Sequence, residues 1–168
     1  MLFDATVLIV FPLAMAFACA MDLVTMTIPN RVSLALVAAF AVLAPFAGLA
    51  PGVIGLHVGL AVVMLGVGFF LFSMGWIGGG DAKLFAATAL WIGPDHIVQY
   101  AIVASILGGL LTMLILLLRM MPLPVGLARQ EWIARLHDSQ TGVPYGIALA
   151  AAGLWIYPHT IWMQPLMR

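Results

Sequence analysis

Charged residues divide this chain into long apolar segments whose lengths match a lipid bilayer. A membrane-crossing helix needs about 20 residues, because the hydrocarbon core is about 30 Å thick and a helix rises about 1.5 Å per residue. Residues 5–21 carry no charge, and their apolar character continues to Ile28. Residues 32–80 are long enough for two crossings joined by a turn near Pro51-Gly52, and residues 96–118 are long enough for one more.

Two further crossings are predicted from shorter or interrupted segments. Residues 139–167 are apolar after a break at Gly142-Val143-Pro144. The stretch 84–94 supplies only 11 residues, so a crossing here must include residues upstream of Lys83, and Asp81 enters the membrane with them. We therefore predict an all-α membrane protein with about six transmembrane helices, the fourth of them short.

The composition agrees with a polytopic membrane protein. Of the 168 residues, 65% are hydrophobic and 7% are charged, and the mean hydropathy is +1.19, so a soluble domain could not cover this apolar surface. We predict one integral-membrane domain over residues 1–168. The net charge of zero argues against nucleic-acid binding. Cys19 is the single cysteine, which excludes an internal disulfide and a cysteine-based metal site, and we expect neither a metal nor another cofactor.

The placement of Lys and Arg orients the helices, because cytoplasmic loops are enriched in these residues. With six crossings and the N-terminus outside, five of the six basic residues lie on the cytoplasmic side, and Arg168 lies outside. The five are Arg31, Lys83, Arg119, Arg129 and Arg135. Asp22 and Asp81 are then brought to the same, cytoplasmic end of the membrane, although they are far apart in the chain.

These two aspartates are the strongest candidates for a functional site, because an ionisable side chain at membrane depth is costly. Asp22 interrupts an apolar run six residues before its end, where Ile28-Pro29-Asn30 follows. Pro29 predicts a helix break, and Asn30 is placed to cap the next helix. The structural alternative for Asp22 is a boundary side chain that reaches water or caps a neighbouring helix.

Asp81 closes a run of three glycines, Gly78-Gly79-Gly80. Each glycine in a helix interior costs about 1 kcal/mol relative to alanine, so the run predicts irregular backbone. At membrane depth such backbone persists only where it is buried in protein or lines a watery cavity. The alternative is a cytoplasmic turn in which Asp81 caps the fourth helix.

Two carboxylates at one site supply the groups needed for aspartyl hydrolysis. They tend to share one proton, because like charges close together do not both ionise easily. The ionised carboxylate can take a proton from water while the protonated one polarises a scissile carbonyl. The same pair could relay protons or bind a cation. A small ion-coupled transporter and a non-catalytic membrane subunit of a pilus or secretion assembly are therefore alternative functions.

Three motifs in the chain resemble the type IV prepilin peptidase family, whose members are intramembrane aspartic peptidases with a Gly-x-Gly-Asp motif. They are Ala20-Met21-Asp22 with Ile28-Pro29-Asn30, then Gly78-x-Gly80-Asp81-Ala82-Lys83-Leu84, and Val143-Pro144-Tyr145-Gly146 before the last helix. The similarity in order, spacing and topology covers roughly residues 5–160.

The resemblance implies that Asp22 and Asp81 are the catalytic pair. It assigns to the substrate-binding or active-site loops Gly78, Gly80, Lys83, Pro29, Asn30, Pro144 and Tyr145. It also implies a bacterial inner-membrane enzyme that removes the basic leader of prepilins and pseudopilins at the cytoplasmic boundary, alongside the pilus assembly machinery. Longer family members carry a cysteine-rich region and methylate the new N-terminus, so this chain resembles the short, peptidase-only form associated with Flp pili.

Three other features give further expectations. Residues 119–141 form the longest polar stretch, and apolar residues interleaved with charges favour an interfacial amphipathic helix, with a plain cytoplasmic loop as the alternative. The pair Gly55-x₃-Gly59 predicts a helix-packing contact, because small residues let transmembrane backbones approach closely. Lys83 has the simpler interpretation of a positive-inside anchor.

Overall fold

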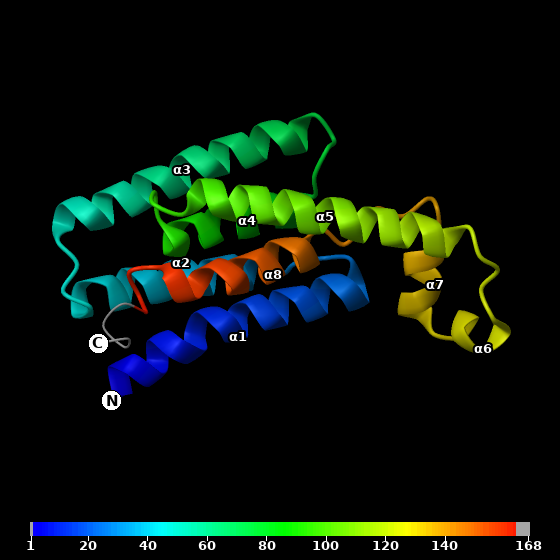
Figure 1. The fold of residues 1–168 in the computed structure, drawn as a ribbon, viewed down its shortest axis with the longest axis horizontal. Coiled ribbons are helices and arrows are strands. Elements are labelled where there is room, and N and C mark those ends of the chain that lie inside the picture. The colour runs from blue at the N-terminus through cyan, green and yellow to red at the C-terminus, as the bar shows by residue number, and fades with distance from the viewer. Residues whose placement is uncertain (1, 164–168) are drawn as a thin grey trace.

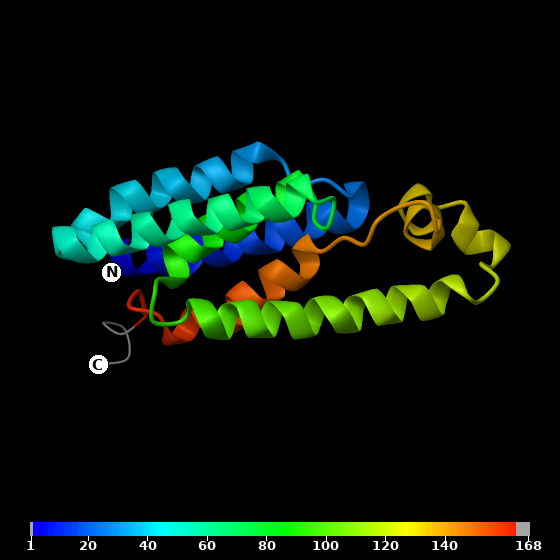
Figure 2. The same cartoon turned by 90° about the horizontal axis from the view of Figure 1, so that it is seen from above.

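The computed structural model describes residues 2–163 and the side chains of residues 6–163, and this part of the chain forms helices and no strands. The bundle is built from α1 (Leu2–Thr25), α2 (Asn30–Phe46), α3 (Pro51–Ser73), α4 (Gly79–Ile92), α5 (Ile97–Arg119) and α8 (Gly146–Ile156). The short helices α6 (Val125–Ala128) and α7 (Glu131–His137) lie at one end of it (Figure 1 and Figure 2). A 3₁₀ turn, η1 (Tyr157–His159), follows α8. The prediction of an all-α fold is confirmed.

The helices differ in whether their length suffices to cross a membrane. Within the described residues, three segments are long and apolar enough, namely Thr6–Thr25, Pro51–Ser73 and Ile97–Arg119. Helix α2 is apolar but has 17 residues, and α4 and α8 have 14 and 11. The protein is therefore membrane-like, whereas the number of six crossings stays a prediction.

The last helix is shorter than the crossing predicted over residues 139–167. Helix α8 ends at Ile156, and the 3₁₀ turn that follows contains Pro158. Proline cannot donate a backbone hydrogen bond to the preceding turn, which favours the end of the α-helix here. The 11 residues of α8 are about half of what a full crossing needs. Residues 164–168, which include Arg168, lie outside the described part of the chain.

Helix α4 is short but deeply packed, with contacts to α2, α3, α5 and α8 and nine of its 14 residues buried. Near its C-terminal end, the Trp91 indole N–H donates to the Leu36 carbonyl at 3.0 Å, and the Trp91 carbonyl accepts from the Trp162 indole N–H at 2.9 Å. The His57 Nδ1 lies 2.7 Å from the Leu90 carbonyl oxygen. These interactions fix the end of α4 that is remote from Asp81.

Helix α3 packs on the bundle through a single narrow face. Its buried residues are His57 and Gly68, and a Cβ atom at Gly68 would lie 3.0 Å from the Cβ of Ala82 in α4. By contrast, nothing lies within 4 Å of a Cβ placed on Gly55 or Gly59. The predicted contact through Gly55 and Gly59 is therefore wrong within this chain, because the helix turns its Gly68 face toward α4.

The turns between the first three helices also correct details of the prediction. Helix α1 ends at Thr25, and Met26 has a positive φ of 55°. Pro29 occupies the N-cap position of α2, and Asn30 is the first helical residue and makes no capping hydrogen bond. The prediction that Asn30 caps the helix is therefore wrong. Pro51 begins α3, so the turn between α2 and α3 lies just before it, close to the predicted position.

Residues 119–141 form neither one continuous amphipathic helix nor a loop without structure. They contain α6 and α7, with four and seven residues. The Arg119 guanidinium donates to the carbonyls of Leu136 at 2.9 Å and Gly142 at 3.0 Å, and Arg135 donates to the Val24 carbonyl at 3.0 Å. The segment is thus tied to the ends of both α5 and α1.

Topology can be tested with single cysteines at Gly52 and Ser139 in a Cys19→Ser background. Both positions are exposed, and nothing lies within 4 Å of a Cβ at Gly52, so cysteine is accommodated. Because Gly52 begins α3 and Ser139 follows α7, we expect a membrane-impermeant thiol reagent to reach them from opposite sides.

The parent without an introduced cysteine serves as the unlabelled control. Labelling of both positions in intact cells, with no further labelling after the membrane is permeabilised, would contradict the predicted topology.

Candidate active site

Asp22 lies in the last turn of α1 and is almost completely buried, with 4% of its surface exposed. Its Oδ2 accepts a hydrogen bond from the Gly146 backbone N–H at 2.7 Å. Gly146 is the first residue of α8, and the N-terminus of a helix favours a negative charge through its free N–H groups. The carboxylate therefore has a defined partner inside the protein.

The close approach of α8 to Asp22 depends on glycine at position 146. A Cβ atom at Gly146 would lie 2.8 Å from Asp22 Oδ2 and would also overlap the Ile28 side chain. Real Cβ atoms do not approach a neighbour this closely, so another residue here would push α8 away from the carboxylate. Steric crowding by Asp22 and Ile28 thus explains why a glycine follows Pro144-Tyr145.

Asp81 lies in the first turn of α4, directly after the three glycines. Its Oδ2 accepts a hydrogen bond from the Gly78 backbone N–H at 3.2 Å. Its Oδ1 is buried and has no hydrogen-bond partner among the described residues. An unpartnered buried oxygen costs free energy, and such groups are often kept for a chemical role.

The run of glycines is more regular than its sequence predicts. Gly79 and Gly80 belong to the first turn of α4, and Gly78 stands at the N-cap position. Gly78 has no side chain, so the single bond from its N–H to Asp81 is half of a capping box. A Cβ at Gly80 would lie 3.2 Å from the Cβ of Ile28, which shows how closely α4 approaches the turn after α1.

Ile28 joins the three segments that carry the site. It contacts Gly80 at the start of α4 and Gly146 at the start of α8, and it belongs to the turn that follows Asp22. Asp22 also acts electrostatically on Asp81. The structure therefore brings the two sequence-predicted aspartates to the same end of the bundle, as hydropathy and charge placement had indicated.

The segment before α8 adds an aromatic side to this site. The Tyr145 ring covers Gly108 of α5, where any side chain would overlap it, and the Tyr145 hydroxyl donates to the Ala104 carbonyl at 3.4 Å. Tyr145 directly precedes Gly146, whose backbone N–H binds Asp22. Pro144 is fully buried. Pro144 and Tyr145 thus directly precede the residue that binds Asp22, and their assignment to an active-site loop stays a prediction.

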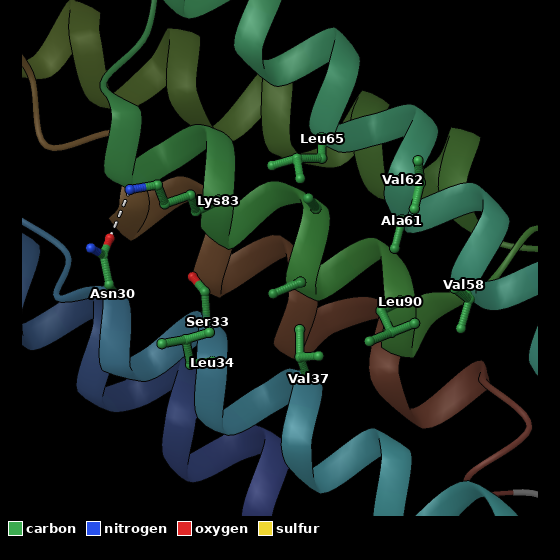
Figure 3. A pocket seen from close by; sticks show the side chains of 12 residues that line it. Asn30, Ser33, Leu34, Val37, Val58, Ala61, Val62, Leu65, Lys83 and Leu90 are labelled. Carbon is green, nitrogen blue, oxygen red and sulfur yellow. Dashed lines mark hydrogen bonds between the residues drawn. The ribbon is translucent and has the colours of Figure 1, made fainter.

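Two of the predicted site residues face another part of the molecule. The Lys83 ammonium donates to Asn30 Oδ1 at 2.8 Å, and both residues line a groove between α2, α3 and α4 (Figure 3). Lys83 follows Asp81 by two positions, and residues at that spacing point to different sides of a helix. Lys83 and Asn30 therefore lie outside the aspartate site, on the side of the first turns of α4 that faces away from Asp81.

Sequence reasoning did not single out Ile28 and Gly146 as individual site residues. Both belong to motifs in which adjacent residues were predicted as site residues. Their own role becomes visible only in the contacts between segments that are far apart in the chain. Within residues 6–163, no three or more His, Cys, Asp or Glu side chains gather where they could hold a metal ion. The residues gathered here are instead two carboxylates, a tyrosine and backbone N–H donors.

Such an arrangement can perform proton-transfer chemistry. Asp81 lies in the first turn of α4, and Asp22, although it belongs to the last turn of α1, faces the first N–H of α8. Helix N-termini stabilise negative charge, yet two negative charges near each other repel. Protonation of one of the two carboxyl groups would relieve the repulsion. The unpartnered Asp81 Oδ1 leaves one oxygen available to a reacting group.

Comparison with known proteins gave one match. The sequence profile of the type IV leader peptidase family matches residues 9–113, which is more than half of the chain. The matched part includes both aspartates and the three glycines, and it ends before Pro144. A search of curated proteins and a search of solved structures gave no match.

The steric role of Gly146 predicts that Gly146→Ala destabilises the protein. Overpacking of a close contact typically costs about 1–3 kcal/mol, and here it displaces the start of α8 from Asp22. Thermal unfolding in detergent should show a clear decrease of the melting temperature.

Gly142→Ala is the matched control, because nothing lies within 4 Å of a Cβ at that position. It should unfold at a temperature close to that of the wild type. Equal melting temperatures for the two variants would contradict the proposed contact.

Proposed function

The chain belongs to the type IV leader peptidase family, and from this membership and the geometry of the site we propose an aspartic endopeptidase that removes the basic leader of prepilins and pseudopilins. Its catalytic pair is Asp22 and Asp81, and it needs no cofactor. The observation that supports the proposal is the close approach of α4 and α8 to Ile28, in the turn that follows Asp22, with Asp81 in the first turn of α4.

In the proposed reaction the two carboxyl groups hold one proton between them. The ionised group takes a proton from a water molecule, which attacks the scissile carbonyl carbon. The protonated group donates to the carbonyl oxygen and so stabilises the charge that develops there. When the tetrahedral intermediate collapses, the peptide nitrogen leaves with a proton returned from the pair.

The location of the pair suits a substrate that is cut where it enters the membrane. Asp22 lies three residues before the end of α1, and Asp81 lies in the first turn of α4. The same end of α1 is bound by Arg135, which belongs to the segment with the highest density of basic residues. The positive-inside rule supports a cytoplasmic position for this end, in the bacterial inner membrane and close to the pilus assembly machinery.

The alternative functions fit these observations less well. An ion-coupled transporter is expected to hold its ionisable residues near the midplane, between two halves that alternate in access. Here both acids lie at one end of the bundle. A non-catalytic assembly subunit would give no reason for a buried Asp81 oxygen without a partner beside a second buried carboxylate.

The proposal predicts that Asp22→Asn and Asp81→Asn each reduce leader removal by at least about 100-fold, the range that general acid–base catalysis supplies. Asparagine keeps the size and polarity of the side chain but cannot hold the shared proton. The double variant should lose little more, because the pair acts as a unit. Co-expression with a candidate prepilin, followed by gel mobility and N-terminal mass, measures the cleavage.

Asp95→Asn is the control for this experiment, since Asp95 is exposed in the turn before α5 at the other end of α4. It should cleave at nearly the wild-type rate. Near-normal processing by either Asp22→Asn or Asp81→Asn, at equal expression, would falsify the assignment.

The absence of a cysteine-rich insert from this sequence predicts that the product is not methylated by this protein. A pilin cleaved by this protein alone should keep a free amino terminus, which N-terminal mass spectrometry detects directly. A methylated product from cells that lack any other family member would refute this prediction.

A further inference from the structure

A groove of about 470 Å³ lies between α2, α3 and α4, on the side of α4 away from the aspartates. Apolar side chains form most of its walls, among them Leu34 and Val37 of α2, Val58 and Leu65 of α3, and Leu90 of α4 (Figure 3). The volume is within the range of about 300–1,000 Å³ that small-ligand sites occupy. The proposed leader peptidase reaction does not use this groove.

Polar groups gather at one end of the groove. The Lys83 ammonium has three N–H donors, and one of them is bound by Asn30 Oδ1 at 2.8 Å. Ser33 also lines the groove. It is buried, and its hydroxyl has no hydrogen-bond partner among the described residues. The lining residues, all in the described part of the chain, include no Asp or Glu. This end therefore carries a positive charge that no lining acid neutralises.

The length of the groove limits what it can hold. Its lining runs from Asn30 to Val37 on α2 and from Lys83 to Leu90 on α4. Seven residues of helix correspond to about 10 Å, and one leaflet contributes about half of the 30 Å hydrocarbon core. With the predicted topology, the groove extends from the membrane boundary toward the midplane and stops within one leaflet. A transmembrane helix of a partner would need a longer surface.

We propose that this groove binds one anionic phospholipid. An acyl chain lies along the apolar walls, and the phosphate accepts hydrogen bonds from Lys83, with the Ser33 hydroxyl available to an ester oxygen. Arg31 is exposed next to Asn30 and adds a second positive charge near the headgroup. Basic side chains at the cytoplasmic surface attract anionic lipids, whereas they repel a basic leader peptide.

The bound lipid would join two segments that also carry the aspartate site. Asn30 directly follows Ile28-Pro29, and Lys83 lies one turn after Gly80, where a Cβ would lie 3.2 Å from the Cβ of Ile28. A phosphate on Lys83, next to Asn30, would therefore hold the start of α2 against the start of α4. The binding itself does not depend on the proposed peptidase activity, and its test measures lipid.

The test is a titration of delipidated protein in detergent with phosphatidylglycerol or phosphatidylcholine, followed by native mass spectrometry. We expect one phosphatidylglycerol to bind with about fivefold higher affinity than phosphatidylcholine, which is the effect of one Lys near an anionic headgroup. Lys83→Gln should remove this preference, and Lys83→Arg should retain it. Arg129→Gln, an exposed cation outside the groove, should leave it unchanged.

Filling the groove provides a second test. Ala61→Phe should abolish binding of both lipids. If this variant does not fold, Val62→Trp is the alternative groove-filling variant, because Val62 is 64% exposed and also lines the groove. Ala16→Phe on the exposed surface of α1 is the control and should bind normally. Equal affinity for the two lipids, an unchanged preference in Lys83→Gln, or displacement of the lipid by an uncleaved prepilin would each overturn the proposal.

Discussion

The hydrogen bond from the Gly146 N–H to Asp22 organises the cytoplasmic-facing end proposed for this bundle. It joins the last turn of α1 to the first residue of α8, across 124 positions of sequence. The bond depends on the lack of a side chain at residue 146, because a Cβ there would overlap both the Asp22 carboxylate and the Ile28 side chain. The same Ile28 receives Gly80 of α4, so one contact surface sets the position of both aspartates.

The two ends of the 14-residue helix α4 differ in structure: one is fixed by hydrogen bonds, and the other carries an unpartnered carboxylate oxygen. Its C-terminal end is fixed by indole and imidazole bonds to backbone carbonyls, with Trp91 and His57 as the buried side chains. Its N-terminal end begins with glycines that allow α4 to approach Ile28 and keeps one Asp81 oxygen without a partner. Burying an oxygen without a hydrogen-bond partner costs free energy. The close packing of the rest of α4 can offset this cost, as it does for strained residues at functional sites.

Hydropathy and charge placement were sufficient to predict helices and to bring Asp22 and Asp81 to one end, because both depend on residue order alone. They could not predict that Asn30 binds Lys83 instead of capping α2, since the two residues are 53 positions apart. They also overestimated α8, whose end at Ile156 reflects Pro158 and not a loss of apolar character. Gly55 and Gly59 match a helix-packing motif, yet α3 packs on α4 through a different face, where Gly68 lies against Ala82.

The two sides of the first turns of α4 have opposite electrostatic character. Asp81 faces Asp22, the turn at Ile28 and the start of α8, whereas Lys83 is directed to Asn30 and the apolar groove. A lysine paired with Asp81 would stabilise its ionised form and oppose the sharing of a proton with Asp22. Because the helix turns Lys83 away to Asn30, the groups that act on Asp81 are the Asp22 carboxylate and the Gly78 N–H. A positive residue can thus lie two positions from the proposed catalytic acid without neutralising it.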